Sequence, residues 1–569
     1  MATTGTTLMG AGTGIRVRLS VMMFLEFMIW ASWYVPIGGY MNSTLHFTGG
    51  QIGWIYTTTA LGAIIAPLFV GFVADRFFPT QVVLGVLHLA GAVFLLLASF
   101  QTTFLPLMVL LLLHCLCFMP TLALANSLGL RNIDDRDKFS RITVWGTIGW
   151  IVSGLLVSFL LGGETKPNFF YLGTLGGVLM GLYCFTLPHT PPKGAEGEID
   201  VLGLGAAKLL SDPSFLIFSL SVFLISIPLT CYFTWMNAFL VETDRPRPTA
   251  LMTLAQCSEI VVMYIMPWFI NQIGLKNVLL IGMIAWVVRY LLFATVSFPL
   301  IILGLLLHGF CYSFVFVASF IYADRKAPPG LSASVQSFLA FLMWGLGMFV
   351  GAKLAGWVGD MYGPTTLLAT IQKGDNPPQE ERLPLPKWEQ MLAAQMPRSV
   401  PLDSSMPGTK VAIIDAGGPK IALVEKLNVW WTLPPDYIVE EKDPEGKSVQ
   451  KTIFPADKLL DVFKEADANE DGVVTHEEWQ LVAIHRWPPI WLWPALLAAV
   501  VVVLFWVGGQ EAPPAAASAQ SAPSASSQPG ATEPTQPSST GPSAVPQQPG
   551  GPTSPPTPGG SGLTQPEIF

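Results

Sequence analysis

The chain has 569 residues, of which 51% are hydrophobic and only 12% are charged, and its mean hydropathy is +0.52. These values exclude an ordinary soluble globular protein and indicate a chain that lies in a lipid bilayer. The formal net charge is −8. Because no basic stripe is present to neutralise phosphates, nucleic acid is excluded as a partner.

Apolar stretches of about twenty residues recur along the chain, and each is long enough to cross about 30 Å of hydrocarbon as a helix. Their unbroken apolar character excludes a closed β-barrel, because the strands of a barrel alternate between apolar and polar residues. The sequence therefore predicts twelve spans. They lie near 18–41, 51–74, 81–100, 104–128, 143–162, 168–187, 214–240, 249–272, 277–297, 299–323, 333–358 and 490–508.

The spans fall into two groups of six, which suggests two bundles that face each other across a central cavity. We predict an all-α membrane protein of two six-helix bundles with a small extramembrane insert, in which short strand-like runs lie at 410–418 and 420–431. The Pro- and Ser-rich tail cannot bury enough apolar surface to fold and is expected to be disordered. The predicted parts are the first bundle (1–187), a connector (188–213), helices seven to eleven (214–362), the insert (363–488), the twelfth helix (489–508) and the tail (509–569).

Basic residues in the short loops predict the orientation, because loops on the cytoplasmic side carry more Lys and Arg. If the N-terminus is inside, twelve basic residues lie in the inner loops and three in the short outer loops. Arg16 and Arg18 lead into a full-length first span, so we expect this helix to stay in the membrane. We predict a multi-pass protein of the cell (inner) membrane with both termini in the cytoplasm and the insert on the outer side.

A carboxylate, Glu259, interrupts the apolar run LAQCSEIVVMYIMPW at 254–268. An ionised carboxylate at the centre of a membrane helix costs about 2.5–3.5 kcal/mol, a cost that protonation or a wet cavity avoids. Gln256 lies three residues earlier on the same helical face, so both side chains are expected to point at the contents of a cavity. The alternative is structural: Glu259 pairs with Arg289 of the next span and fixes helix packing.

A second intramembrane carboxylate, Glu26, shares a helical face with Trp30 and Trp33 at offsets of four and seven residues. A planar base that stacks on such rings gains about 1–3 kcal/mol for each ring. The alternative is that these tryptophans make contacts within the bundle. Three histidines also lie within spans, where they either relay protons or bond to a neighbouring helix. They are His88, His114 and His308.

The segment DANEDGVVTHEE at 467–478 fits the twelve-residue loop of an EF-hand, with Gly472 at the turn. A lone loop of this kind is expected to bind Ca²⁺ weakly, with a Kd on the order of 10⁻⁴ to 10⁻³ M, and to act as a structural clip. The alternative is an acidic, solvated turn. The expected ligands are Asp467, Asn469, Asp471, Val473 through its carbonyl group, and Glu478.

Four blocks of sequence resemble a known transporter family. GFVADRFFPT (71–80) resembles the Gly-x-x-x-Asp-Arg loop of the major facilitator superfamily, in which Asp75 and Arg76 are expected to latch the cytoplasmic side. The segments at 24–41, at 117–132 with VWGTIGWI (144–151), and at 256–294 resemble the nucleoside:proton symporter family within that superfamily. The resemblance covers roughly residues 15–360 and the final span. It implies a twelve-helix, alternating-access carrier with the major facilitator fold.

The resemblance also implies where substrate is bound. Gln256 and Glu259 match polar positions that family members use near the substrate, whereas Glu26 stands where Gln is more frequent in the family. Thr143 replaces a family Arg, Thr230 and Phe233 stand at amide positions, and Ser313 replaces a family Asp. These departures remove donors that orient a ribose or a base. The expected substrate-binding residues are Glu26, Trp30, Trp33, Thr143, Thr147, Trp150, Thr230, Phe233, Gln256, Glu259 and Ser313.

Two classes of function remain open on the sequence. The first is secondary active uptake of a nucleoside or a related small polar solute, in which a proton binds at Glu259, and Glu26 is a possible further site. The second is a membrane-anchored receptor whose insert binds a ligand or partner. An enzyme is not expected, because no set of nucleophile, base and orienting group is visible. We expect a monomer whose partners are a nucleoside-like solute, a proton and the bilayer.

Overall fold

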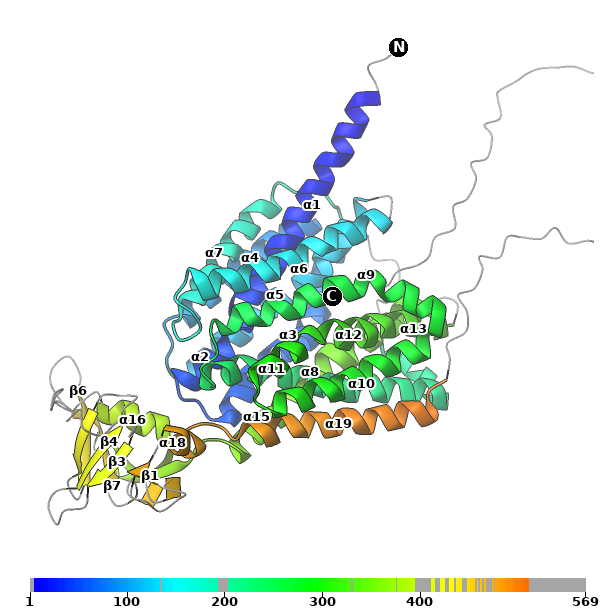
Figure 1. Cartoon of the computed structure of the whole chain (residues 1–569). Coiled ribbons are helices and arrows are strands. Elements are labelled where there is room, and N and C mark those ends of the chain that lie inside the picture. The colour runs from blue at the N-terminus through cyan, green and yellow to red at the C-terminus, as the bar shows by residue number, and fades with distance from the viewer. Residues whose placement is uncertain are drawn as a thin grey trace, which may run out of the picture.

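The computed structural model describes residues 5–133, 136–192, 203–328, 331–374, 376–393 and 476–510, together with short pieces of strand and helix between 411 and 474. Figure 1 shows a large helical body and a smaller sheet-containing unit at one end of it. The smaller unit is the insert, and we call the end of the helical body that carries it the insert end.

The first bundle contains the helices α1 to α7, and its buried side chains are mostly apolar. The first predicted span is in fact two helices, because the break at Val35 and Pro36 separates α1 from α2. Proline has no backbone N–H to continue the helical ladder, which accounts for the break. The helices are α1 (Gly5–Tyr34), α2 (Ile37–Ser43), α3 (Gly49–Arg76), α4 (Thr80–Ala98), α5 (Phe104–Arg131), α6 (Arg136–Phe159) and α7 (Asn168–Cys184).

The second bundle follows a short 3₁₀ helix, η1 (Leu204–Ser211), that lies in the predicted connector. Two of its spans are not regular α-helices, because π-helical turns interrupt them at Ser313–Val317 and at Phe341–Gly347. Such turns are frequent at functional sites. The helices are α8 (Pro213–Glu242), α9 (Pro248–Ile273), α10 (Leu275–Ala294), α11 (Phe298–Leu306), α12 (His308–Tyr312), α13 (Ala318–Lys326), α14 (Ser332–Ala340), α15 (Met348–Met361) and α19 (Trp487–Gly508).

Ten helical segments of the described residues are long and apolar enough to cross a membrane, judged by length and composition. The shorter apolar helix α7 accompanies them, as does α3. Each predicted span has a helix at its position, while the number of twelve transmembrane helices stays a prediction. Large apolar side chains on the outside of the bundles, such as Leu496, Val500 and Val503 of α19, are exposed, as expected for a surface that faces lipid.

The main contacts between the two bundles are those of α3 with α15, α6 with α9, and α2 with α8. Small residues allow close approach in the first pair: a Cβ atom on Gly356 would lie 2.5 Å from the carbonyl oxygen of Gly49. At the same place the backbone N–H of Gly50 donates to Asp360 at 2.8 Å. These contacts lie where α3 begins and α15 ends, so the bundles are closed against each other at the insert end.

The insert contains two antiparallel four-stranded sheets, with strand orders β2-β1-β7-β6 and β5-β4-β3-β8. The predicted strand-like runs correspond to β3, β4 and β5, whereas β1, β2, β6 and β7 were not expected. The element bounds are β1 (Thr366–Lys373), β2 (Gln379–Pro384), α16 (Leu385–Ala393), β3 (Val411–Ile414), β4 (Lys420–Val424), β5 (Val429–Leu433), β6 (Asp436–Lys442), β7 (Ser448–Pro455), β8 (Val473–Val474) and α18 (His476–Ala483).

Candidate functional site

A cavity lies between the two bundles, and residues of both bundles form its wall. The free space at its centre is about 10 Å³, which is room for a single water molecule. The bundles must therefore move apart before a solute larger than water can enter. The lining residues are Ala31 and Val35 of α1, Trp150 and Gly154 of α6, Tyr232 and Phe233 of α8, and Thr249, Met252, Thr253 and Gln256 of α9.

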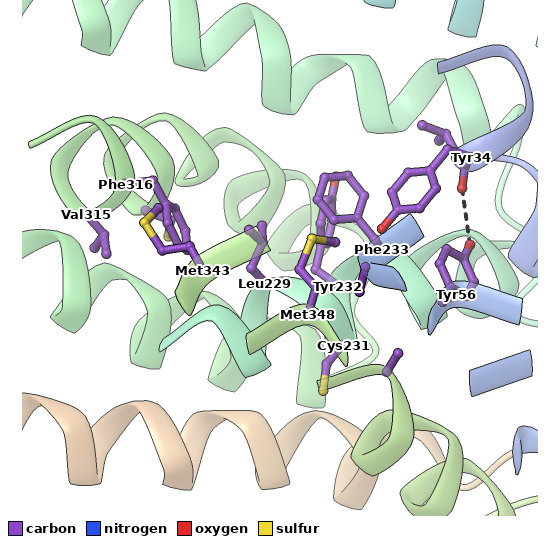
Figure 2. Packing of buried hydrophobic residues seen from close by; sticks show 14 of the residues in the cluster. Tyr34, Tyr56, Leu229, Cys231, Tyr232, Phe233, Val315, Phe316, Met343 and Met348 are labelled. Atoms are coloured by element: carbon purple, nitrogen blue, oxygen red, sulfur yellow. Dashed lines mark hydrogen bonds between the residues drawn. The ribbon is translucent and has the colours of Figure 1, made fainter. Parts of the chain in front are cut away.

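Aromatic rings from the two bundles meet beside this cavity. Trp150 contacts Trp30 with ring centroids 5.5 Å apart and Phe233 with centroids 6.3 Å apart. Tyr34 also lies against Phe233, with centroids 5.2 Å apart, and Figure 2 shows these two rings side by side. Planar faces from both bundles thus converge where a flat ring could stack. By contrast, Trp33 is 1% exposed and packs against His114 within the first bundle.

The predicted polar residues occupy different places around the cavity. Gln256 lines it. Thr230 is buried, and its hydroxyl donates to the carbonyl oxygen of Ser226 at 2.9 Å. Ser313 is also buried, whereas Thr143 and Thr147 are half-buried on α6. None of these four belongs to the lining, so the structure gathers Trp150, Phe233 and Gln256 at the cavity and places the threonines and the serine around it.

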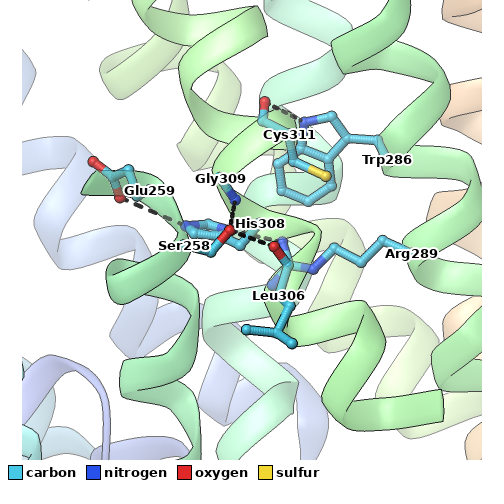
Figure 3. A network of polar contacts seen from close by, with 8 residues as sticks. All are labelled: Ser258, Glu259, Trp286, Arg289, Leu306, His308, Gly309 and Cys311. Carbon is cyan, nitrogen blue, oxygen red and sulfur yellow. Dashed lines mark hydrogen bonds and ion pairs between the residues drawn. The ribbon is translucent and has the colours of Figure 1, made fainter. Parts of the chain in front are cut away.

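Glu259 lies one helical turn beyond Gln256 on α9, and its side chain is 13% exposed. Its carboxylate oxygen Oε2 is 4.0 Å from Nε2 of His308. The alternative of a direct pair with Arg289 is not what the structure has, because Arg289 donates a hydrogen bond to Nδ1 of His308 at 2.8 Å. Figure 3 shows His308 between the other two side chains, so a buried imidazole links the carboxylate to the guanidinium.

Glu26 has a different environment, inside the first bundle. Its Oε2 atom accepts a hydrogen bond from Nε2 of His88 at 2.9 Å, and its Oε1 atom accepts one from Thr121 at 2.6 Å. The side chain is 0% exposed and does not line the cavity between the bundles. Burial of a carboxylate is tolerated here because donors satisfy both oxygens. Glu26 is therefore part of the packing of α1 against α4 and α5.

The latch and most of the calcium loop lie outside what the structure describes. Asp75 and Arg76 end α3, but the positions of their side chains are not described. Asp467, Asn469 and Asp471 lie outside the described residues. Val473 belongs to β8, which pairs with β3, and Glu478 lies in α18. Val473 and Glu478 are thus the only members of the predicted ligand set among the described residues, and Ca²⁺ binding stays a prediction.

Sequence reasoning named Arg289 as an alternative partner of Glu259 but missed the place of His308 between them. It also missed the part played by Tyr232 and Thr253 in the lining of the cavity. His308 was singled out only as a histidine within a span. The signal that could have found the link was three polar side chains in consecutive spans of otherwise apolar sequence, because such side chains pair with one another inside a bilayer. Thr253 precedes Gln256 by three residues and so shares its helical face.

Comparisons with known proteins match the helical part of the chain to one family of transporters. The family model described as "Nucleoside H+ symporter" matches residues 13–369. The putative nucleoside transporter YegT of Escherichia coli (strain K12) is 42% identical over 355 residues, which cover 60% of this chain and 83% of that protein. The xanthosine permease of Escherichia coli (strain K12) is 31% identical over 371 residues, which cover 61% of this chain and 88% of that protein.

A crystal structure of nucleoside transporter NupG superimposes with a TM-score of 0.57 and 29% identity, covering 61% of this chain and 91% of that chain. The fold is thus that of a helical membrane transporter. These relatives are transporters and permeases, so the exclusion of an enzyme is confirmed and the receptor alternative gains no support. The match to the family model spans more than half of the chain. The resemblance seen in the sequence is therefore confirmed: the chain belongs to the nucleoside H⁺ symporter family.

Proposed function

We propose that this protein carries nucleosides into the cell together with protons, by alternating access of the cavity between its two bundles. The observation that carries the proposal is the cavity wall itself, in which aromatic rings of both bundles and the amide of Gln256 meet one helical turn from Glu259. An uncharged planar base needs flat apolar faces and a few polar partners to orient it. The names of the relatives point to the same class of solute.

The base is expected to stack on Trp150 and Phe233 once the bundles part. Stacking of a base on an aromatic side chain contributes about 1–3 kcal/mol. Gln256 offers one acceptor and two donors to the edge of the base. Because Thr143, Thr230 and Ser313 replace larger polar residues of the family, we propose that recognition here depends more on stacking than on hydrogen bonds to the ribose.

Proton coupling is assigned to Glu259. Its carboxylate accepts no hydrogen bond from the described residues, so its charged form is poorly compensated when the cavity is closed, and a proton neutralises it. Glu26, with both oxygens satisfied, is less suited to exchange a proton in each cycle. The gradient supplies about 2.3 kcal/mol per charge for each 100 mV and about 1.36 kcal/mol for each pH unit. One proton at 100 mV and one pH unit thus supports accumulation of several hundredfold.

The orientation of the protein in the membrane is inferred from the excess of basic residues in alternate loops. We propose that both termini lie in the cytoplasm of a cell whose inner membrane holds the protein, and that the insert lies outside. The closed insert end is then the outer gate, and Asp75 and Arg76 latch the opposite end when the outer gate opens. We further propose a monomeric carrier whose loop at 467–478 binds Ca²⁺ weakly and stiffens the insert.

The test is uptake of labelled uridine and adenosine by vesicles that contain the purified protein. An inward proton gradient should drive accumulation, and a protonophore should abolish it. Glu259→Gln should lose accumulation yet still exchange internal for external nucleoside, because a neutral side chain can cross in both directions. Accumulation that survives both the protonophore and Glu259→Gln would disprove proton coupling at this residue. A labelled sugar or amino acid serves as the control solute.

A further inference from the structure

Arg289 is a buried cation without a carboxylate of its own. The side chain is 0% exposed, and its guanidinium carbon lies 4.0 Å from the centre of the Tyr232 ring and 5.1 Å from that of Trp286. Among the described residues, no carboxylate forms a direct ion pair with it. An isolated charge is costly in such a place, and stacking on aromatic faces offsets only part of the cost. Its charge therefore has to be balanced at longer range.

The hydrogen bond between Arg289 and His308 determines where the imidazole carries its proton. A guanidinium group only donates, so Nδ1 of His308 must accept with its lone pair. In the neutral ring the proton then sits on Nε2, the atom that lies 4.0 Å from Oε2 of Glu259. A second proton at Nδ1 would require the bond to Arg289 to break. His308 is thus held as a donor directed at Glu259, and it is unsuited to carry protons.

We infer that Arg289 and His308 are positioning residues for the proton site: Arg289 supplies a fixed counter-charge, and His308 transmits it to Glu259 by offering Nε2–H to the ionised carboxylate. This inference rests on the proposed function of Glu259. The three side chains together are neutral when Glu259 is ionised and carry one positive charge when it is protonated. The arrangement favours the ionised form and so helps Glu259 to release its proton after each passage.

Other titratable groups near the site do not take over this role. Tyr232 of α8 and Tyr312 of α12 pack against the imidazole, with ring centroids 5.4 and 5.7 Å from that of His308. The thiol of Cys311 lies next to Arg289. Buried phenol and thiol groups stay neutral around pH 7. Among the described neighbours, only Arg289 and Glu259 bring formal charge to the imidazole.

The first experiment compares His308→Phe with His308→Gln in vesicles, by the dependence of proton-driven uridine uptake on internal pH. Phenylalanine removes the donor, so the ionised carboxylate loses support and holds its proton more tightly. Release of the proton limits uptake at low internal pH, so we expect this acidic limb of the profile to move upward by about one pH unit. Glutamine keeps an N–H donor and should restore most of the wild-type profile. The control is His114→Phe, at a buried histidine of the first bundle that bonds to a backbone carbonyl.

The second experiment is a double-mutant cycle with Arg289→Gln and His308→Phe. If the charge of Arg289 acts through His308, Arg289→Gln should move the profile in the wild-type background and have little further effect in His308→Phe. Equal shifts in both backgrounds would overturn the link. If the Arg289→Gln variant does not fold, the comparison of His308→Phe with His308→Gln alone decides whether His308 positions the proton site.

The outcomes separate this inference from the proposed function. If Glu259→Gln keeps its accumulation, the assignment of Glu259 fails whatever the histidine variants do. If Glu259→Gln loses accumulation while His308→Phe, His308→Gln and the wild type share one pH profile, only the positioning role is overturned. Infrared difference spectra give a readout that does not need transport, because the protonated carboxyl band that is missing in Glu259→Gln should persist to higher pH in His308→Phe.

Discussion

The two intramembrane glutamates show how the surroundings of a carboxylate decide its role. Glu26 receives hydrogen bonds at both oxygens from His88 and Thr121, and it lies within one bundle. Glu259 lies near the contact between bundles, and its Oε2 atom lies 4.0 Å from Nε2 of the neutral His308. A carboxylate that loses no partner during rocking is a structural element. A carboxylate whose oxygens lack hydrogen-bond donors is free to exchange protons.

Glu26→Gln should therefore damage stability more than coupling. The amide can keep one acceptor, but its NH₂ group then faces Nε2–H or the hydroxyl of Thr121, and one buried group loses its partner. The loss is expected to cost about 1–3 kcal/mol of unfolding free energy. Thermal unfolding in detergent measures this cost, and the protonophore-sensitive fraction of uptake should stay as in the wild type. A variant that unfolds normally but no longer accumulates nucleoside would contradict the assignment.

Trp150 is the residue whose loss should affect substrate affinity most. Its ring contacts Trp30 of the same bundle and Phe233 of the other. Trp150→Ala removes one stacking face, so KM for uridine should rise about tenfold, within the range expected for one lost base stack. Trp33→Phe is the matched control because Trp33 packs away from the cavity against His114. Equal KM values for Trp150→Ala and the wild type would remove Trp150 from the site.

At the scale of helices, small residues determine how far the bundles can close. Gly49 and Gly53 of α3 face Gly356 and Ala352 of α15, with backbone atoms in direct contact. A Cβ atom on Gly53 would lie 2.5 Å from the carbonyl oxygen of Ala352. Real Cβ atoms do not approach backbone so closely, and backbone at the centre of a helix cannot move aside alone. The two helices α3 and α15 would therefore have to move apart along their whole contact.

Gly356→Ala should hold the insert end partly open. The added methyl group would meet the carbonyl oxygen of Gly49 at 2.5 Å, so α3 and α15 must separate. We expect the maximal rate of uptake to fall several-fold with a smaller change in KM, because closure and not binding is impaired. Gly14→Ala is the control, since no atom lies within 4 Å of the place that its methyl group would take. An unchanged maximal rate in Gly356→Ala would show that α3 and α15 need not close against each other during transport.

At the scale of the whole molecule, the insert is attached at two adjacent points. The N–H of Arg486 donates to the carbonyl oxygen of Tyr362 at 2.8 Å, so the chain leaves and re-enters the helical body at nearly one place. Glu242, which ends α8, accepts from the backbone N–H and from Nδ1 of His485 at 3.0 and 2.9 Å. The same carboxylate accepts from Asn42 of the first bundle at 2.5 Å. The insert, the second bundle and the first bundle meet at Glu242.

Removal of residues 364–486 with a short Gly/Ser linker should leave most of the uptake. The ends to be joined are adjacent, and such sites tolerate deletion. The central cavity is built without any residue of the insert. Uptake normalised to the folded protein in the membrane is the measurement. A deletion variant that inserts and folds but does not transport would show that the insert takes part in the cycle.

The positions of the spans could be predicted because a bilayer demands long apolar helices, and hydropathy reports this directly. The sheets of the insert were only partly visible, because β1 pairs with β7 across about eighty intervening residues and the strands are short. Trp150, Phe233 and Gln256 were identified as site residues by resemblance. The partners of Glu26, and the place of His308 between Glu259 and Arg289, were not identified, because these side chains come from other helices and depend on how the helices pack.

The position of Glu242 has a practical consequence. An antibody fragment that binds the folded sheets of the insert from solution need not enter the bilayer. By shifting the insert it would disturb the contact of His485 with Glu242, and hence that of Glu242 with Asn42. Such a fragment would favour one of the two conformations of the carrier without occupying the central cavity. An extramembrane handle of this kind offers a way to arrest the protein in a single state, for inhibition or for imaging.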